Sequence, residues 1–423
     1  MKRVFAFGVL GVGSSRLFAL FAQTVTSILV ARELGPENYG QLAFVLAVIN
    51  LAAIPVTGGL NPLLVREVAK SHAGKDWREM SGLLTGAYRW VGRNSVIVLL
   101  LVLGAVAAFP SYFAEGRAAL FLIAGLLIPL WGVVTIRTAV LQGLGRVVQA
   151  QMPDWLFNPA FYLFAVVLLW YGNVLTDVSA LVAAVCASAV GLLAATIALK
   201  NGLPQQVGVS AGAQDYPWFR MLLPFGAIHA LMVGNTHLVP VMLGAISNDA
   251  AVGLYRVADA IAMLVPLSLI VVNAVAAPQV VRLYAAGERE KLQHIARTSA
   301  RTAFALTIPL VVLMLAAGNW LIELVFGVEY ADAYPAVLIL LLGQIVNVSC
   351  GSVNMLLNMA GMEHESMYAL LGAVVINMIL CSLLIPGHAE IGAAISAAVS
   401  LTAWNLWLLW RVRVRIGVWA AVI

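Results

Sequence analysis

Charged residues are scarce in this chain of 423 residues. Asp, Glu, Lys and Arg together make up 10% of it and hydrophobic residues 62%, whereas soluble domains carry about 25% charged residues. A folded protein in water needs more polar cover than this. The composition therefore excludes a soluble enzyme, a disordered chain and a small secreted module held together by disulfides.

Cysteine is equally rare, with three residues, Cys186, Cys350 and Cys381, each inside an apolar run. No pair of them has the spacing of metal ligands. We therefore predict no metal site and no disulfide.

Long polar segments and catalytic motifs are also missing. The chain has no Walker-type phosphate loop and no polar loop with the paired carboxylates that sugar hydrolysis uses. These absences predict a protein that is not an enzyme, with no catalytic residues and no cofactor. The net charge of +5 does not indicate nucleic acid, because membrane proteins retain Lys and Arg on their cytoplasmic side.

What the chain does contain is a series of continuous apolar runs. A helix needs roughly 20 apolar residues to cross a hydrocarbon core about 30 Å thick. The runs predict an all-α integral membrane protein with twelve transmembrane helices. The expected spans are residues 4–31, 41–65, 94–109, 118–140, 155–171, 178–199, 219–246, 252–281, 302–325, 335–359, 367–385 and 391–410.

The distribution of cations predicts the orientation. With Lys2 inside, 20 of the 24 Lys and Arg residues fall on the inner side, Arg32 and Arg117 fall outside, and Arg16 and Arg256 lie within apolar runs. Such a bias is the positive-inside signal of membrane proteins. We expect a multi-pass protein of the plasma (inner) membrane with both termini in the cytoplasm.

A faint internal repeat divides the chain. Four pairs of similar positions recur at offsets of 213 to 216 residues: Gly40 and Gly253, Asp76 and Arg289, Gly145 and Gly361, Gly172 and Gly387. The repeat predicts an N-lobe (1–205), a cytoplasmic linker (206–216) and a C-lobe (217–423). Six spans in each half give two parallel six-helix lobes around a central cavity, an architecture that suits a transporter. Prolines interrupt the repeat-related spans two and eight, at Pro55, Pro62, Pro266 and Pro278.

Arg16 is an unusual residue for a membrane span, because an ionised side chain in lipid is costly and usually functional. It precedes Arg32 by 16 residues on the same predicted helix, or about 24 Å. One interpretation is an anion contact in the central cavity. The other is a structural pair, or a side chain that reaches the inner surface.

Polar residues on spans seven and eight are further candidates. Arg256 and Asp259 have i, i+3 spacing, which predicts either an intrahelical ion pair or a substrate or gating pair in the cavity. Span seven carries His229, Asn235 and His237; Asn235 and His237 point about 200° apart on a helix. They either form hydrogen bonds between helices or include a protonatable coupling residue. Amides on several spans fit a hydrated cavity: Gln23, Asn61, Asn273, Gln344, Asn347, Asn354 and Asn377.

Several motifs resemble those of polysaccharide-export flippases in the multidrug/oligosaccharidyl-lipid/polysaccharide exporter superfamily. Residues 32–40, Arg-Glu-Leu-Gly-Pro-Glu-Asn-Tyr-Gly, are similar to the signature between the first two helices of that family. Residues 252–255 with Ala258, residues 326–330 (Phe-Gly-Val-Glu-Tyr), and Pro386 followed by residues 391–394 are similar to its later motifs. Many relatives have an aspartate in span seven, where this chain has Asn235-Thr236-His237.

The resemblance implies a flippase that moves a polyprenyl-pyrophosphate-linked oligosaccharide from the inner to the outer leaflet by alternating access, for polysaccharide biosynthesis such as O-antigen or exopolysaccharide export. Arg16, Arg256 and Asp259 would then contact substrate, while His237, Asn235, Gln23 and Asn61 would serve coupling or line the cavity. The implied partners are the lipid-linked oligosaccharide, membrane lipid and polysaccharide polymerase machinery.

Other functions predict different residues. A cation-coupled multidrug exporter of the same superfamily would favour acidic residues in its cavity, where this chain places an arginine. A membrane polymerase or glycosyltransferase would need a large outer loop with catalytic groups, and a structural scaffold would not require Arg16.

Overall fold

The computed structural model describes the backbone of residues 2–111, 113, 116–203 and 218–422, with side chains from Ser15 onward in these ranges. Helices and short turns, with no β-strand, make up this part of the chain. The prediction of an all-α protein is therefore confirmed. The predicted linker 206–216 lies outside the described residues.

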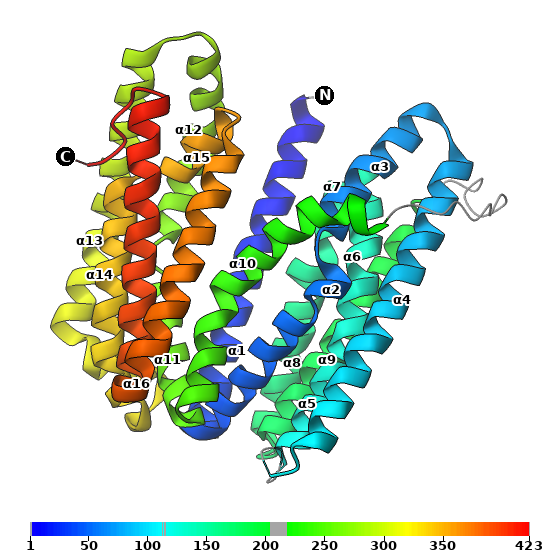
Figure 1. The fold of residues 1–423 in the computed structure, drawn as a ribbon, viewed down its shortest axis with the longest axis vertical. Helices are drawn as coiled ribbons and strands as arrows, with labels where there is room; N and C mark the ends of the chain where they lie inside the picture. The colour runs from blue at the N-terminus through cyan, green and yellow to red at the C-terminus, as the bar shows by residue number, and fades with distance from the viewer. Residues whose placement is uncertain (1, 112, 114–115, 204–217, 423) are drawn as a thin grey trace. The chain divides into compact units, whose positions relative to one another are not determined.

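The chain divides into two compact units (Figure 1). Unit 1 comprises Met1–Leu34 and Val45–Val233, and unit 2 comprises Gly35–Phe44 and Gly234–Ile423. Two helices contribute to both: α1 (Lys2–Ala52) and α10 (Trp218–Ile246). The further helices of unit 1 are α2 (Ile54–Thr57), α3 (Leu60–Gly74), α4 (Trp77–Ala108), α5 (Arg117–Gly125), α6 (Leu127–Gly143), α7 (Val147–Met152), the π-helical turn η1 (Pro153–Phe157), α8 (Asn158–Tyr171) and α9 (Asp177–Lys200).

Unit 2 is built from long helices that pack side by side (Figure 1). Its helices besides α10 are α11 (Asp249–Ala262), α12 (Leu267–Ala285), α13 (Arg289–Phe326), the 3-10 turn η2 (Val328–Ala333), α14 (Tyr334–Cys350), α15 (Val353–Met359) and α16 (Glu363–Arg415). Small residues allow close packing: a Cβ added to Gly343 of α14 would lie 2.9 Å from the Cα atom of Ala398 on α16.

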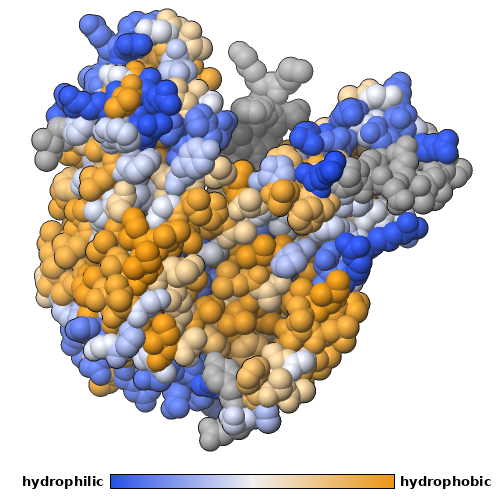
Figure 2. Space-filling view, in the orientation of Figure 1, coloured by the Kyte–Doolittle hydropathy of each residue, from blue (hydrophilic) through white to orange (hydrophobic). Residues whose placement is uncertain are grey.

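Ten helical segments among the described residues are long and apolar enough to cross a membrane. On the face drawn in Figure 2, hydrophobic side chains cover the middle of unit 2, and hydrophilic ones gather toward its ends. Exposed leucine, valine and phenylalanine side chains recur along these helices in both units. Because such surfaces are stable in lipid and not in water, the chain is a multi-pass membrane protein.

The two longest helices, α1 and α16, each contain a break. In α1 the break is at Gly35 (φ 71°, ψ 172°), which precedes Pro36, and the ribbon of α1 turns back there (Figure 1). In α16, which has 53 residues, it is at Ala389 (φ 42°, ψ −121°), three residues after Pro386. The two arms of α16 then lie together, since Ser400 donates a hydrogen bond of 2.6 Å to the carbonyl of Ala373.

Two of the four predicted proline interruptions are real breaks. Pro55 lies in the short α2, between a turn at Ala53 and turns at Gly58 and Gly59. Pro266 ends the turn that separates α11 from α12. Pro62 instead lies in the first turn of α3, and Pro278 lies inside the continuous helix α12. The breaks thus fall where a second local feature, a glycine pair or a run of turn residues, accompanies the proline.

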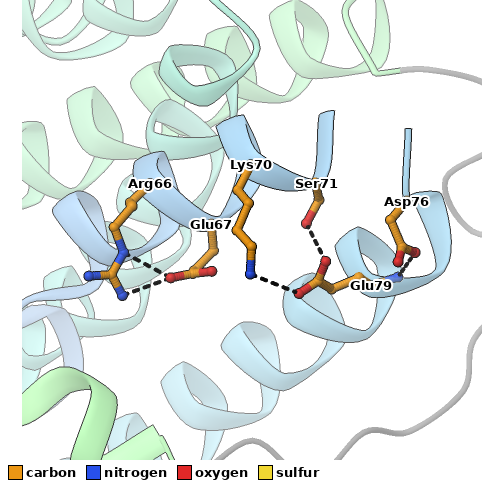
Figure 3. Close-up of polar contacts among 6 residues, drawn as sticks. All are labelled: Arg66, Glu67, Lys70, Ser71, Asp76 and Glu79. Atoms are coloured by element: carbon orange, nitrogen blue, oxygen red, sulfur yellow. Dashed lines mark hydrogen bonds and ion pairs between the residues drawn. The ribbon is translucent and has the colours of Figure 1, made fainter. Parts of the chain in front are cut away.

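Polar contacts close the hairpin between α3 and α4 (Figure 3). The Asp76 carboxylate caps α4 by accepting a hydrogen bond of 2.8 Å from the backbone N–H of Glu79. Glu79 in turn accepts a 3.2 Å bond from Ser71 Oγ and pairs with Lys70 Nζ at 4.0 Å. As a result α4 begins at Trp77, well before the predicted start of its span at residue 94.

Candidate functional site

Arg16 lies in unit 1 with its guanidinium over the ring of Trp155, 5.5 Å from the ring centroid. Its side chain is exposed, and Trp155 is half-buried in η1. A cation over the face of an aromatic ring is attracted to it. The contact therefore holds the Arg16 guanidinium beside Trp155, and the exposed side chain can still donate hydrogen bonds to an anion.

The neighbours of Arg16 also indicate its depth. Gly35, where the helix breaks, follows Arg16 by 19 residues, or about 28 Å of helix, close to the roughly 30 Å of a hydrocarbon core. Trp155 lies in the single π-helical turn that precedes α8. This spacing predicts that Arg16 lies toward the end of its span opposite Gly35, rather than at the middle.

Gln23 and Asn61 are the other candidate residues of unit 1. Gln23 is exposed and follows Arg16 by two helical turns, so both lie on one face of α1. Asn61 is half-buried in the first turn of α3. That turn follows Gly59, where an added Cβ would lie 2.6 Å from the backbone nitrogen of Gly226 on α10. The tight contact fixes the start of α3 and with it the position of Asn61.

A cavity of about 120 Å³ opens inside unit 2, between α10, α11, α14 and α16. Asn235 and Asp259 line it, as do several polar residues that the sequence did not bring together. The other polar or aromatic lining residues are Thr236, Tyr255, Gln344, Asn377, Ser400 and Trp404. With one carboxylate and three amides on its wall, this cavity can hold water or a small polar ligand.

Arg256 and Asp259 form the ion pair that their spacing predicts. Arg256 Nη1 lies 3.4 Å from Asp259 Oδ2, and their side chains are 34% and 22% exposed. They stand on α11, whose first turn is capped by Asn248 through a 2.8 Å hydrogen bond from the Ala251 N–H. Of the pair, only Asp259 lines the cavity.

His237 does not line the cavity, although Asn235, two residues earlier, does. Both side chains are half-buried on α10. The helical geometry that points them to different sides predicts this separation. His229 also lies on α10 and is half-buried, in the part of that helix that belongs to unit 1.

This cavity has three further lining residues that the sequence did not predict, Tyr255, Ser400 and Trp404. Tyr255 lies four residues before Asp259 and therefore on the same face of α11, a signal that was present in the sequence. Ser400 and Trp404 repeat the same spacing on α16. The indole nitrogen of Trp404 is buried and has no hydrogen-bond partner among the described residues.

The motifs that carry the family resemblance meet in unit 2. A Cβ on Gly40 would lie 2.7 Å from the backbone nitrogen of Gly253, and one on Gly253 would lie 2.9 Å from the carbonyl carbon of Pro36. The rings of Tyr39 and Tyr330 meet edge to face at 6.5 Å between centroids. Three motifs far apart in the sequence thus form one packed joint.

Possible metal ligands do not gather in the part of the chain that the structure describes: it contains no group of three or more His, Cys, Asp and Glu residues arranged to hold a metal ion. The three cysteines are free.

Several solved structures have a fold similar to that of this chain. An inward-facing multidrug resistance MATE family transporter of the MOP superfamily matches with a TM-score of 0.75 and 15% identity, over 94% of each chain. The lipid II flippase MurJ, in an inward closed conformation, matches with a TM-score of 0.72 and 14% identity, over 96% of this chain and 87% of its own. A MOP superfamily transporter from Pyrococcus furiosus Vc1 matches with a TM-score of 0.65 and 13% identity, over 97% and 95%. The chain therefore has the fold of a MOP superfamily transporter.

Comparison with family models is more specific. The MatE family model matches residues 224–383, and no curated protein matches the chain in sequence. The model described as "Polysaccharide biosynthesis protein" matches residues 8–284, well over half of the chain. This match confirms the resemblance inferred from the motifs, and the chain belongs to the polysaccharide biosynthesis protein family.

Proposed function

We propose that this protein is a flippase that moves a polyprenyl-pyrophosphate-linked oligosaccharide from the inner to the outer leaflet by alternating access. The observation that carries the proposal is the exposed Arg16 guanidinium over the ring of Trp155, in a chain of the polysaccharide biosynthesis protein family. MurJ, a lipid II flippase, has the same fold.

The chemistry of Arg16 suits this substrate. A pyrophosphate must lose water to cross the hydrocarbon core, and an arginine replaces that water with bidentate, charge-assisted hydrogen bonds. Under the predicted orientation Arg16 lies near the cytoplasmic end of its span, where the pyrophosphate of an inner-leaflet lipid first arrives. Arg16 is thus the group that receives the substrate.

The proposed topology has twelve spans. The helices α1, with 51 residues, and α16, with 53 residues, each cross twice, because each is long enough for two spans and is broken between them, at Gly35 and at Ala389. The two extra crossings added to the ten candidate segments give six spans in residues 1–205 and six in residues 217–423, with 206–216 as a cytoplasmic linker. Both termini are cytoplasmic and the membrane is the plasma (inner) membrane.

The proposed topology rests on the sequence repeat, in which Gly40 and Gly253 occupy equivalent positions. These two glycines pack against each other within unit 2.

The remaining candidates have subsidiary roles in this proposal. Arg256 and Asp259 contact the substrate or act as a gating pair, since both remain partly exposed. Asn235, His237, Gln23 and Asn61 supply polar groups along the pathway or take part in coupling. The oligosaccharide delivered outside would pass to polysaccharide polymerase machinery.

A cation-coupled multidrug exporter is the second candidate function. Two observations favour it: the MatE model matches residues 224–383, and the carboxylate of Asp259 lines the cavity of unit 2. A carboxylate in a cavity attracts cationic drugs, whereas Arg16 repels them. The two functions therefore assign different substrates to different residues.

Reconstitution into liposomes distinguishes the two functions. A fluorescent polyprenyl-pyrophosphate oligosaccharide is incorporated, and a membrane-impermeant quencher reports how fast it exchanges between leaflets. We expect exchange with the wild-type protein and none with Arg16→Ala. Export of a cationic dye that depends on Asp259, without exchange of the lipid-linked sugar, would instead establish the exporter.

A further inference from the structure

An apolar groove of about 400 Å³ runs along the surface of unit 1, between the α7–η1 segment and α9. Its α9 wall is a stripe at helical spacing from Val190 to Asn201, and its other wall includes Met152 and Phe157. Leu193 on the α9 wall is 59% exposed and Phe157 42% exposed. Exposed apolar side chains on membrane-spanning helices face lipid, so lipid is what fills this groove.

The local backbone explains why the two helices do not close on each other. They touch at Gly191, where an added Cβ would lie 3.3 Å from the carbonyl oxygen of Pro153 and 3.5 Å from Asn158 Cβ. Pro153 begins η1, a π-helical turn, which widens a helix locally and is frequent at functional sites. On its far side α9 is held by Arg137, which donates hydrogen bonds to Thr196 Oγ1 and to the Leu192 carbonyl. The groove is therefore a fixed feature of unit 1.

The length of the groove matches one leaflet. From Val190 to Asn201 the α9 wall rises about 16 Å at helical geometry, and half of a hydrocarbon core is roughly 15 Å. A chain that lies in the groove from end to end therefore reaches from the membrane surface to the bilayer midplane.

The end of the groove at Asn201 is polar and cationic. Arg146 bridges the two walls: its Nη1 lies 3.3 Å from Gln149 Oε1 on one and 3.4 Å from the Asn201 carbonyl oxygen on the other. Lys200 is exposed beside Asn201. Basic pockets between membrane helices on the cytoplasmic side bind anionic lipid headgroups.

We propose that this groove is a binding site for one anionic phospholipid of the cytoplasmic leaflet, with an acyl chain between η1 and α9 and its phosphate on Arg146. The leaflet rests on the orientation proposed above; the site itself does not. The bound lipid would hold α7, η1 and α9 to one another.

The test measures lipid bound to the purified full-length protein. Native mass spectrometry counts retained phosphatidylglycerol and phosphatidylcholine, and phosphatidylglycerol with a photoreactive acyl chain maps the contact. Arg146→Gln removes the charge and leaves the apolar walls, whereas Ala194→Phe fills the groove and leaves the charge. The matched controls are Arg78→Gln, an exposed arginine of α4, and Ala107→Phe, an exposed alanine of the same helix.

We expect the wild type and both controls to retain one phosphatidylglycerol in preference to phosphatidylcholine, with adducts in residues 149–157 and 190–201. Arg146→Gln should bind it about tenfold more weakly, the effect of losing one charge-assisted contact. Ala194→Phe should also bind it more weakly, because the new ring occupies the place of the acyl chain. Unchanged retention in Arg146→Gln, which needs no repacking, would overturn the proposal. So would displacement of the phospholipid by a polyprenyl phosphate that labels the same residues, because the groove would then hold the transported lipid. Neither result depends on transport activity, so this test does not decide whether the protein is a flippase.

Discussion

Gly40 and Gly253 pack backbone against backbone in unit 2, so closely that a Cβ on Gly40 would lie 2.7 Å from the Gly253 nitrogen. Gly40 closes the motif that follows the first span, and Gly253 belongs to the motif that opens α11. Neither glycine has a positive φ. Their requirement for glycine is therefore one of space and not of backbone conformation.

Replacing Gly253 by alanine should destabilise unit 2. The new methyl group would overlap the Pro36 carbonyl, and overpacking of this kind typically costs about 1–3 kcal/mol. Thermal unfolding of the purified protein should show a lower midpoint. Gly372→Ala in α16 is the matched control, because an added Cβ there meets nothing within 4 Å, and it should be neutral or stabilising. Equal unfolding midpoints for the two variants would show that the backbone around Gly253 and Pro36 can move to make room for a methyl group without loss of stability.

Arg16→Ala should abolish lipid-linked sugar transport while insertion and abundance remain normal. Loss of a desolvated charge contact should weaken substrate binding by about 2–5 kcal/mol. Arg16→Lys should restore transport only in part, because an ammonium cannot form the bidentate fork. The measurement is polysaccharide export in cells at matched protein levels, with Arg78→Ala as the control. Normal export by Arg16→Ala would make Arg16 a structural residue.

Trp155→Leu should reproduce part of the Arg16 defect. The aromatic face orients the guanidinium, and a cation–π contact of this kind contributes about 0.5–2 kcal/mol. Transport assays over a range of substrate concentrations should show a raised half-saturation concentration with a maximal rate closer to that of the wild type. A variant as inactive as Arg16→Ala at every concentration would contradict a purely orienting role for Trp155.

Glu365→Ala should loosen the two arms of α16 from each other. The buried Glu365 carboxylate accepts hydrogen bonds from Arg411 Nε at 2.7 Å and from Arg411 Nη2, and Arg415 Nε lies 3.4 Å away. We expect a loss of stability on the order of 1 kcal/mol, seen as a lower unfolding midpoint. Glu363→Ala removes an exposed carboxylate two residues away and should leave the midpoint unchanged. Similar unfolding midpoints for Glu365→Ala and Glu363→Ala would show that the ion pairs of Glu365 make no net contribution to stability.

Reporter fusions should place Gly35 and Gly327 outside the membrane and Gly208 and Gly287 inside. Both Gly35 and Gly327 have positive φ and end helical arms, so they lie at turns where an inserted reporter is tolerated. Finding Gly35 and Gly208 on the same side would refute the two parallel repeats.

The sequence predicted features that depend on local order. Apolar runs reveal helices that enter lipid, and the i, i+3 spacing of Arg256 and Asp259 predicts their ion pair. The true start of α4 at Trp77 was missed, because a polar helical turn capped by Asp76 carries no apolar signal. The meeting of Asn377, Ser400 and Trp404 with Asp259 was missed too, because neighbours on different helices depend on packing that one sequence does not display.

The segment Gly35–Phe44 belongs to unit 2, although its flanks on both sides belong to unit 1. The covalent chain therefore passes from one unit to the other three times, at residues 34–35, 44–45 and 233–234. If the chain were cut between residues 204 and 217, the amino-terminal fragment would still contribute ten residues, Gly35–Phe44, to unit 2. The two fragments should therefore remain associated. Two separately expressed halves should thus assemble into an active protein. An amino-terminal half without those ten residues should not, because unit 2 would then lack part of its packing.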